Sequence, residues 1–132
     1  LRTVCYGGLS RAHFERFLGG HAHLFDGPGY VCTNDFRPGI HEITTDFFGL
    51  RHDEALFVDD VARVAEAARE LGVAFIGHPT GFEHSHQPRL MRAAGVRHLV
   101  RCLDAIDAAL LRTVDAEMAD GTFWAHPADV PV

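Results

Sequence analysis

Asp59 and Asp60 are the side chains of this sequence with the clearest capacity for chemistry. They directly follow an apolar run at residues 55–58, and continuous runs of this kind are typical of strands inside parallel sheets. Two adjacent carboxylates repel each other unless solvent, a helix N-terminus or a cation offsets their charge. Mg²⁺ takes one or two carboxylates and keeps several waters, so the pair suits a magnesium site. The alternative is that Asp60 only caps the helix expected from Val61, with Asp59 solvated beside it.

The elements that must position this pair alternate between strand and helix. Hydrophobic patterning predicts strands at about residues 1–6, 30–33, 55–58, 73–76 and 98–100, and helices at about residues 10–18, 38–48, 61–71, 88–94 and 103–118. Pro38 suits the first turn of the second helix. The alternation predicts one Rossmann-like, three-layer α/β domain over residues 1–132, with a mainly parallel sheet and right-handed crossovers. Ligands of such sheets bind beyond the carboxyl ends of the strands, where Asp59 and Asp60 are expected.

The composition of the chain argues against a nucleic-acid-binding protein and against a membrane protein. The chain has 132 residues, 47% of them hydrophobic, and a formal net charge of -6, with no Lys among its 12 basic residues. No Arg-rich patch with interleaved aromatics is present, so we expect no nucleic-acid partner. The apolar runs are too short to span a bilayer and no signal peptide is recognisable, so we expect no membrane association and a cytosolic, cytoplasmic protein. Cys5, Cys32 and Cys102 form no CxxC pair and are expected to be buried free thiols.

The segment from Leu56 to Val73 resembles the fourth motif of the haloacid dehalogenase (HAD) superfamily. In that motif a buried strand delivers acids to Mg²⁺, and an Ala-rich helix with a Glu-Ala-Ala-Arg core leads to a glycine and the next strand. Residues 1–18 resemble the second-motif strand and its helix, and residues 94–106 resemble the closing strand and helix. The resemblance covers about residues 1–112, which leaves 113–132 as a C-terminal extension. It implies a HAD-like hydrolase, a Mg²⁺-dependent phosphatase acting on a small phosphorylated metabolite, with the metal held by Asp59 and Asp60.

The resemblance also implies a phosphate site. The family's first motif, which supplies the nucleophile of the aspartyl-phosphate, would lie upstream of Leu1, and we expect residues to precede this chain because it opens inside a strand pattern. Cys5 and Tyr6 stand where the second motif ends in Ser or Thr followed by Asn or Gly. Together with Gly7 and Gly8, whose backbone N–H groups can face an anion, they are the expected substrate-binding residues.

Two departures from the family pattern open an alternative function. The Lys of the third motif is absent, and Arg37 is the nearest cation, so Arg37 is the expected catalytic phosphate clamp, although Arg and Lys are not interchangeable at such a site. Val64 occupies the position of a further acid. The alternative is a non-catalytic HAD-like accessory, assembly or interaction module, acting with a partner chain or as a homo-oligomer.

Two His-x-His pairs suggest a separate metal-handling role. His21 and His23 form one pair, and His84 and His86 form another beside Glu83, in a loop long enough to cover the expected site. Such pairs can place two imidazoles toward Zn²⁺ or Ni²⁺. Spacing fixes no third and fourth ligand, so solvated loops without metal are the alternative.

Overall fold

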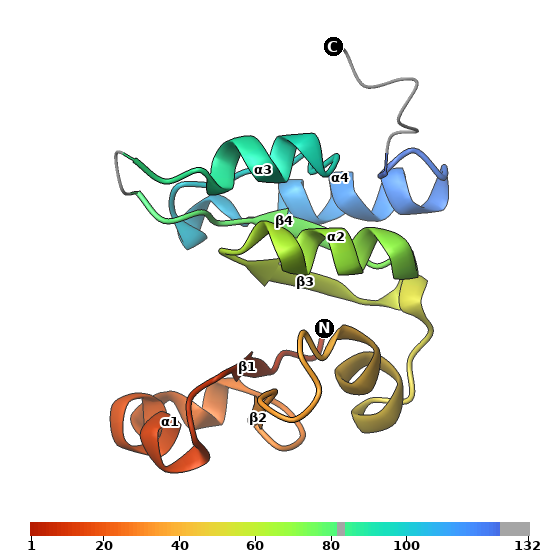
Figure 1. Ribbon diagram of the computed structural model, residues 1–132. Coiled ribbons are helices and arrows are strands. Elements are labelled where there is room, and N and C mark those ends of the chain that lie inside the picture. Colours follow the sequence, from red (N-terminus) through yellow and green to blue (C-terminus); the bar gives the residue numbers. More distant parts are fainter. Residues whose placement is uncertain (82–83, 125–132) are drawn as a thin grey trace. The chain divides into compact units, whose positions relative to one another are not determined.

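The structure is a computed structural model in which residues 1–81 and 84–124 are described. The chain is mixed α/β and divides into two compact units, residues 1–50 and residues 51–132, which we describe one at a time (Figure 1). The strands of the described residues form two parallel sheets of two strands each. In the same residues, no helix is long and apolar enough to cross a bilayer. The division into units does not test the prediction of a single domain, which stays a prediction.

The first unit is built on the parallel strands β1 (Cys5–Gly7) and β2 (Tyr30–Cys32). Helix α1 (Arg11–Leu18) starts as predicted, because the Ser10 side chain caps it by accepting a hydrogen bond from the His13 N–H. The α-helix ends before Gly19, and the chain continues as a 3₁₀ helix, Gly19–Leu24. Phe14 of α1 stacks on the Tyr30 ring with 4.6 Å between centroids, and this buried pair joins α1 to β2.

The second helix of this unit differs from the prediction. Pro38 lies in the turn before the helix rather than in its first turn, and residues Glu42–Phe47 are wound as a π-helix. The wider winding, with more residues per turn than an α-helix, changes which side chains share a face. Ile43 is buried, whereas Phe47 is 49% exposed, although a 3.6-residue period would bury both.

The second unit follows the predicted order closely around Asp59 and Asp60. Strand β3 (Leu56–Asp59) pairs in parallel with β4 (Ala74–Gly77), and helix α2 (Ala62–Leu71) connects them. Gly72 ends α2 with a φ of 75°, a left-handed conformation that glycine adopts without strain. Helices α3 (Gln87–Ala93) and α4 (Ala108–Ala119) complete the unit, with short 3₁₀ helices at His52–Glu54 and Leu103–Ala105.

Two elements predicted in the second unit differ from those in the structure. The strand expected at residues 98–100 is reduced to one parallel bridge between Gly77 and Leu99. The last helix begins at Ala108 instead of about residue 103, because the Asp107 side chain caps it by accepting from the Leu110 N–H. Leu103, which fits the helical period, is 57% exposed. Residue 112, where the family resemblance ends, lies within α4, and the C-terminal extension from residue 113 stays a prediction.

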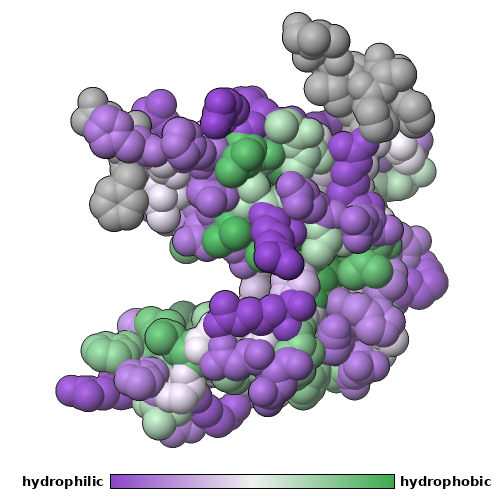
Figure 2. All heavy atoms as spheres, in the orientation of Figure 1, coloured by the Kyte–Doolittle hydropathy of each residue, from purple (hydrophilic) through white to green (hydrophobic). Residues whose placement is uncertain are grey.

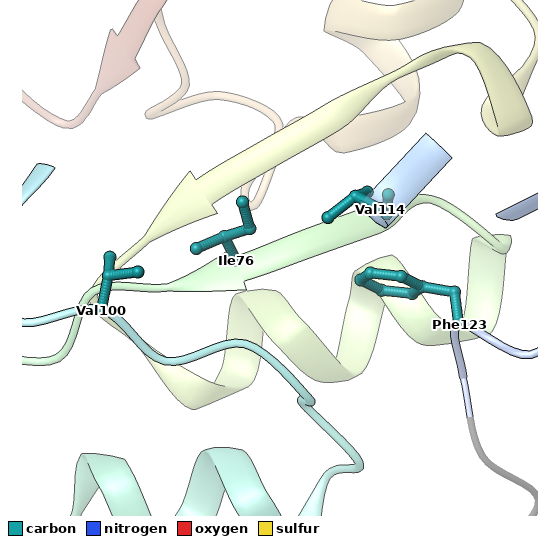
Figure 3. Close-up of a cluster of buried hydrophobic side chains, with 5 residues drawn as sticks. Ile76, Val100, Val114 and Phe123 are labelled. Carbon is teal, nitrogen blue, oxygen red and sulfur yellow. The ribbon is translucent and has the colours of Figure 1, made fainter. Parts of the chain in front are cut away.

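The core of the second unit joins β4 to α4. Figure 3 shows Ile76, Val100, Val114 and Phe123 pointing toward one another, and Ala74 belongs to the same buried cluster. Polar contacts also join α4 to the segment at residues 97–98. Glu117 accepts from Arg97 at 2.9 Å and pairs with His98 at 2.7 Å.

Both units also expose large apolar side chains. Figure 2 shows hydrophobic and hydrophilic residues interspersed on the face that it draws. Among the exposed apolar residues of the first unit, Phe17 is 66% and Leu24 is 60% exposed. Single exposed apolar residues are ordinary on protein surfaces, so we attach no function to them.

Candidate functional site

Asp59 and Asp60 lie where the sequence predicts them, at the carboxyl end of a parallel strand. Asp59 is the last residue of β3, directly opposite Gly77 of β4. Its backbone oxygen accepts a hydrogen bond from the His78 N–H at 2.9 Å, and its carboxylate Oδ1 accepts from the Val61 N–H at 3.0 Å. Asp60 is exposed beyond the strand. The strand end therefore presents one half-buried carboxylate with a structural contact and one carboxylate open to solvent.

The start of α2 decides between the two interpretations of Asp60. The helix begins at Ala62, and Val61 is its N-cap residue, so Asp60 lies one position before the cap. The Val61 N–H donates to Asp59, and the first N–H of the helix donates to a residue far along the chain. The Ala62 N–H donates to Oε1 of Gln87 at 2.7 Å. Asp60 is therefore not the cap that the alternative interpretation required, because Val61 occupies the N-cap position and Gln87 accepts from the first N–H of the helix. Gln87 was missed by the sequence analysis, and nothing in the local pattern marks a partner 25 residues away.

The acidic pair offers a small set of oxygen ligands. Mg²⁺ accepts one or two carboxylates and completes its shell with water and substrate oxygens, so Asp59 and Asp60 fit that ion in donor type and number. A carboxylate that ligates a metal is commonly also hydrogen-bonded, as Asp59 is. Within the described ranges, no cluster of three or more His, Cys, Asp or Glu side chains could hold a metal ion.

The His pairs do not gather into a ligand set in the described part of the chain. His21 and His23 lie exposed in the 3₁₀ helix Gly19–Leu24. His84 and His86 are exposed as well, and Glu83 lies outside the described residues. His78 instead uses Nδ1 against the backbone oxygen of Val100, at 3.0 Å.

Gly8 and Arg37 come together in the first unit. Gly8 follows β1, and the Arg37 guanidinium lies so close that a Cβ at Gly8 would collide with Nη2. The same Nη2 donates to Oδ1 of Asn34 at 2.5 Å, and Nδ2 of Asn34 donates to the Gly8 backbone oxygen at 2.9 Å. Gly8 and Arg37 are predicted from the sequence, whereas Asn34 is not, because only the folded loop brings it between them.

Cys5 and Tyr6 lie on β1 ahead of the glycines. Both are half-buried, and Cys5 pairs with Tyr30 across the sheet. Burial raises the pKa of the Cys5 thiol, with a smaller opposing effect from a backbone hydrogen bond at Tyr6, so Cys5 stays a neutral thiol near neutral pH. Burial also raises the pKa of Tyr30, whose hydroxyl donates to the Leu9 oxygen at 2.6 Å. This end of β1 therefore offers neutral groups and the Arg37 cation.

The cysteines differ from the prediction of buried thiols. Cys5 and Cys32 are half-buried, and Cys102 is exposed just before the 3₁₀ helix Leu103–Ala105. All three are free thiols.

No family model, curated protein or solved structure matches the chain. The function is therefore inferred from two groups of residues, each within its own unit. One group lies at the end of β3, and the other lies at the end of β1.

Proposed function

We propose that this chain is the later part of a Rossmann-like, three-layer core of HAD type, and that it acts as a Mg²⁺-dependent phosphatase on a small phosphorylated metabolite. One observation carries the proposal. A parallel strand ends in Asp59, the next residue, Asp60, is exposed, and the first N–H of α2 is met by Gln87 and not by Asp60. An exposed carboxylate beyond a strand end, not used as a helix cap, is available to a cation, and this supports the proposal.

The packing of the second unit supports the proposed fold. Residues Ala74 and Ile76 of β4 pack with Val114 of α4, and α2 contacts both β3 and β4. Successive side chains of a strand point to opposite faces, so helices on both faces are the arrangement that this pattern favours. The strand–helix–strand order with parallel pairing is that of the βαβ unit on which Rossmann-like domains are built.

The proposed roles follow the chemistry of each group. Asp59 and Asp60 would hold Mg²⁺, which when bound neutralises charge on phosphoryl oxygens. Gly8 would offer its backbone N–H to the phosphate, with Gly7 before it, and Arg37 would pair with a phosphate oxygen. Cys5 and Tyr6 would contribute neutral groups to the same phosphate site. The carboxylate that attacks phosphorus would be supplied outside this chain, as the HAD resemblance implies.

A phosphatase assay on the protein from its complete reading frame tests this function. We expect hydrolysis of some members of a phosphate-ester panel with Mg²⁺ and none with EDTA. Asp60→Asn should lower kcat/KM about 10- to 100-fold, since it removes the charge of one proposed ligand. Asp104→Asn, at an exposed position of a 3₁₀ helix, is the matched control and should leave activity unchanged. Absence of turnover across the panel, or equal activity in Asp60→Asn, would count against the proposal.

A second function is favoured by the hydrogen bond that the Asp59 carboxylate accepts just before α2. That carboxylate holds the start of α2, and Val64 stands on the same helix where a further acid is expected. Both features suit a non-catalytic module that keeps the fold and acts through a partner chain or as a homo-oligomer. Co-purification of a stable partner, together with unchanged cellular function of Asp60→Asn, would support this function over catalysis.

A further inference from the structure

The Asn34 side chain is the link between Arg37 and the backbone at Gly8. Its Nδ2 donates to the Gly8 oxygen at 2.9 Å, and its Oδ1 accepts from Arg37 Nη2 at 2.5 Å. An amide carries a donor and an acceptor at one end of a short side chain, so it can hold both groups at once. Alanine offers neither group, and aspartate offers only acceptors.

Arg37 forms no ion pair with a carboxylate among the described residues. Arg11, Arg51, Arg97 and His98 form ion pairs within residues 1–81 and 84–124, and none of these pairs uses Arg37. Asn34 is neutral, so it orients the guanidinium without cancelling its charge. A guanidinium presents several donors in a fixed plane and pairs well with phosphate oxygens.

The backbone at Gly8 adds a second donor. The β1–β2 pairing ends at Gly7 opposite Cys32, so the Gly8 N–H takes no part in that ladder. Gly8 is exposed, and its lack of a side chain is what lets the guanidinium lie against it. One cation and one N–H therefore lie at the same strand end, and both suit an oxyanion.

We propose that Asn34 is a positioning residue, which holds the Arg37 guanidinium against Gly8 so that Arg37 and the Gly8 N–H bind one phosphate group. The inference rests on the proposed function for the identity of that anion, the phosphate of the substrate. It requires binding alone, so it can be tested without turnover.

The test is a titration of the full chain with inorganic phosphate at constant ionic strength, followed by amide chemical shifts. We expect the Gly8 amide signal to shift and Arg37→Gln to weaken binding about tenfold or more, as for loss of a charge-assisted hydrogen bond. Asn34→Ala should weaken binding about three- to tenfold. Asn34→Asp keeps the size of the side chain but neutralises the cation, and it should weaken binding at least as much.

A double variant separates positioning from a general structural effect. If Asn34 acts through Arg37, then Asn34→Ala in the Arg37→Gln background should cause no further loss of affinity. Arg63→Gln on the exposed side of α2 is the matched control for loss of one positive charge, and it should bind phosphate as the unaltered chain does. Thermal unfolding of every variant should match that of the unaltered chain.

The outcomes distinguish the two proposals. Phosphate binding that depends on Asn34 and Arg37, without hydrolysis of any ester, would uphold this inference and overturn the phosphatase. Binding that depends on Arg37 but is unchanged in both Asn34 variants would overturn the role of Asn34. Absence of phosphate binding, or additive losses in the double variant, would overturn it as well.

Discussion

Single residues at the end of β3 differ in the contacts that they make with the start of α2. Gln87 satisfies the first N–H of α2, Asp59 accepts from the Val61 N–H just before the helix, and Asp60 is exposed. Gln87 is itself held in place, since its N–H donates to Oγ of Ser85 at 3.3 Å. A helix start without side-chain partners leaves backbone donors unsatisfied, so this arrangement stabilises α2 as well as freeing Asp60.

The Gln87 contact predicts a measurable loss of stability. Gln87→Ala should lower the free energy of unfolding by about 0.5–2 kcal/mol, as for loss of a helix cap, because the Ala62 N–H loses its acceptor. Gln87→Glu keeps the acceptor and adds a negative charge near the positive end of the helix dipole, so it should be as stable as the unaltered chain. Urea unfolding followed by circular dichroism measures both. Equal stability of the alanine variant would mean that Gln87 contributes nothing to α2.

At the scale of elements, β4 is the centre of the second unit. All four of its residues are buried, and it pairs with β3 on one side and makes the single bridge to Leu99 on the other. The bridge is framed by hydrogen bonds from the Gly77 N–H to the His98 oxygen and from the Val100 N–H to the Gly77 oxygen. Gly77 is therefore the point where the third segment approaches the sheet.

This close approach predicts that Gly77 cannot carry a side chain without cost. A Cβ at Gly77 would lie 2.5 Å from Leu99 Cδ2 and 2.6 Å from Met91 Sδ, and Met91 is fully buried. Gly77→Ala should therefore destabilise the chain by about 1–3 kcal/mol through overpacking. Gly81→Ala is the matched control, because nothing lies within 4 Å of a Cβ there among the described residues. Thermal unfolding of the two variants tests this, and similar midpoints would contradict the packing argument.

At the scale of the whole molecule, the two units differ in how much core each has. The second unit holds the buried cluster around Ile76, Val114 and Phe123, and Trp124 anchors to the Val73 oxygen at 2.9 Å. The first unit has 50 residues and one two-stranded sheet. A two-stranded sheet is marginal without further packing, and small domains bury a smaller fraction of their surface.

The difference predicts how separate fragments behave. Residues 51–132 expressed alone should unfold in one cooperative urea transition, because the core cluster and its polar ties lie within that unit. Residues 1–50 alone should show a broad, weakly cooperative transition. Matched unfolding curves of the two fragments and the full chain measure this. Loss of cooperative unfolding in the fragment 51–132 would show instead that the chain folds as the single domain expected from its sequence.

The sequence by itself determined the elements whose signals are local. The apolar run before Asp59, the helical period from Ala62 to Leu71 and the glycine at position 72 produce β3, α2 and its end, because each depends on residues a few positions apart. Ser10 likewise predicts the start of α1. The type and place of the acidic pair were readable for the same reason, whereas Gly8 and Arg37 became candidates only through the family resemblance.

Only the tertiary structure decided the features that join distant parts of the chain. Gln87 meets Ala62, and Asn34 sets Arg37 against Gly8, through contacts that no local period encodes. The segment at residues 98–100 has strand-forming residues, yet it makes one bridge to β4, because pairing also depends on how the neighbouring chain approaches. Periodicity fixes which residues can form an element. Packing between elements fixes where an element starts, how it pairs and which polar groups meet at its ends.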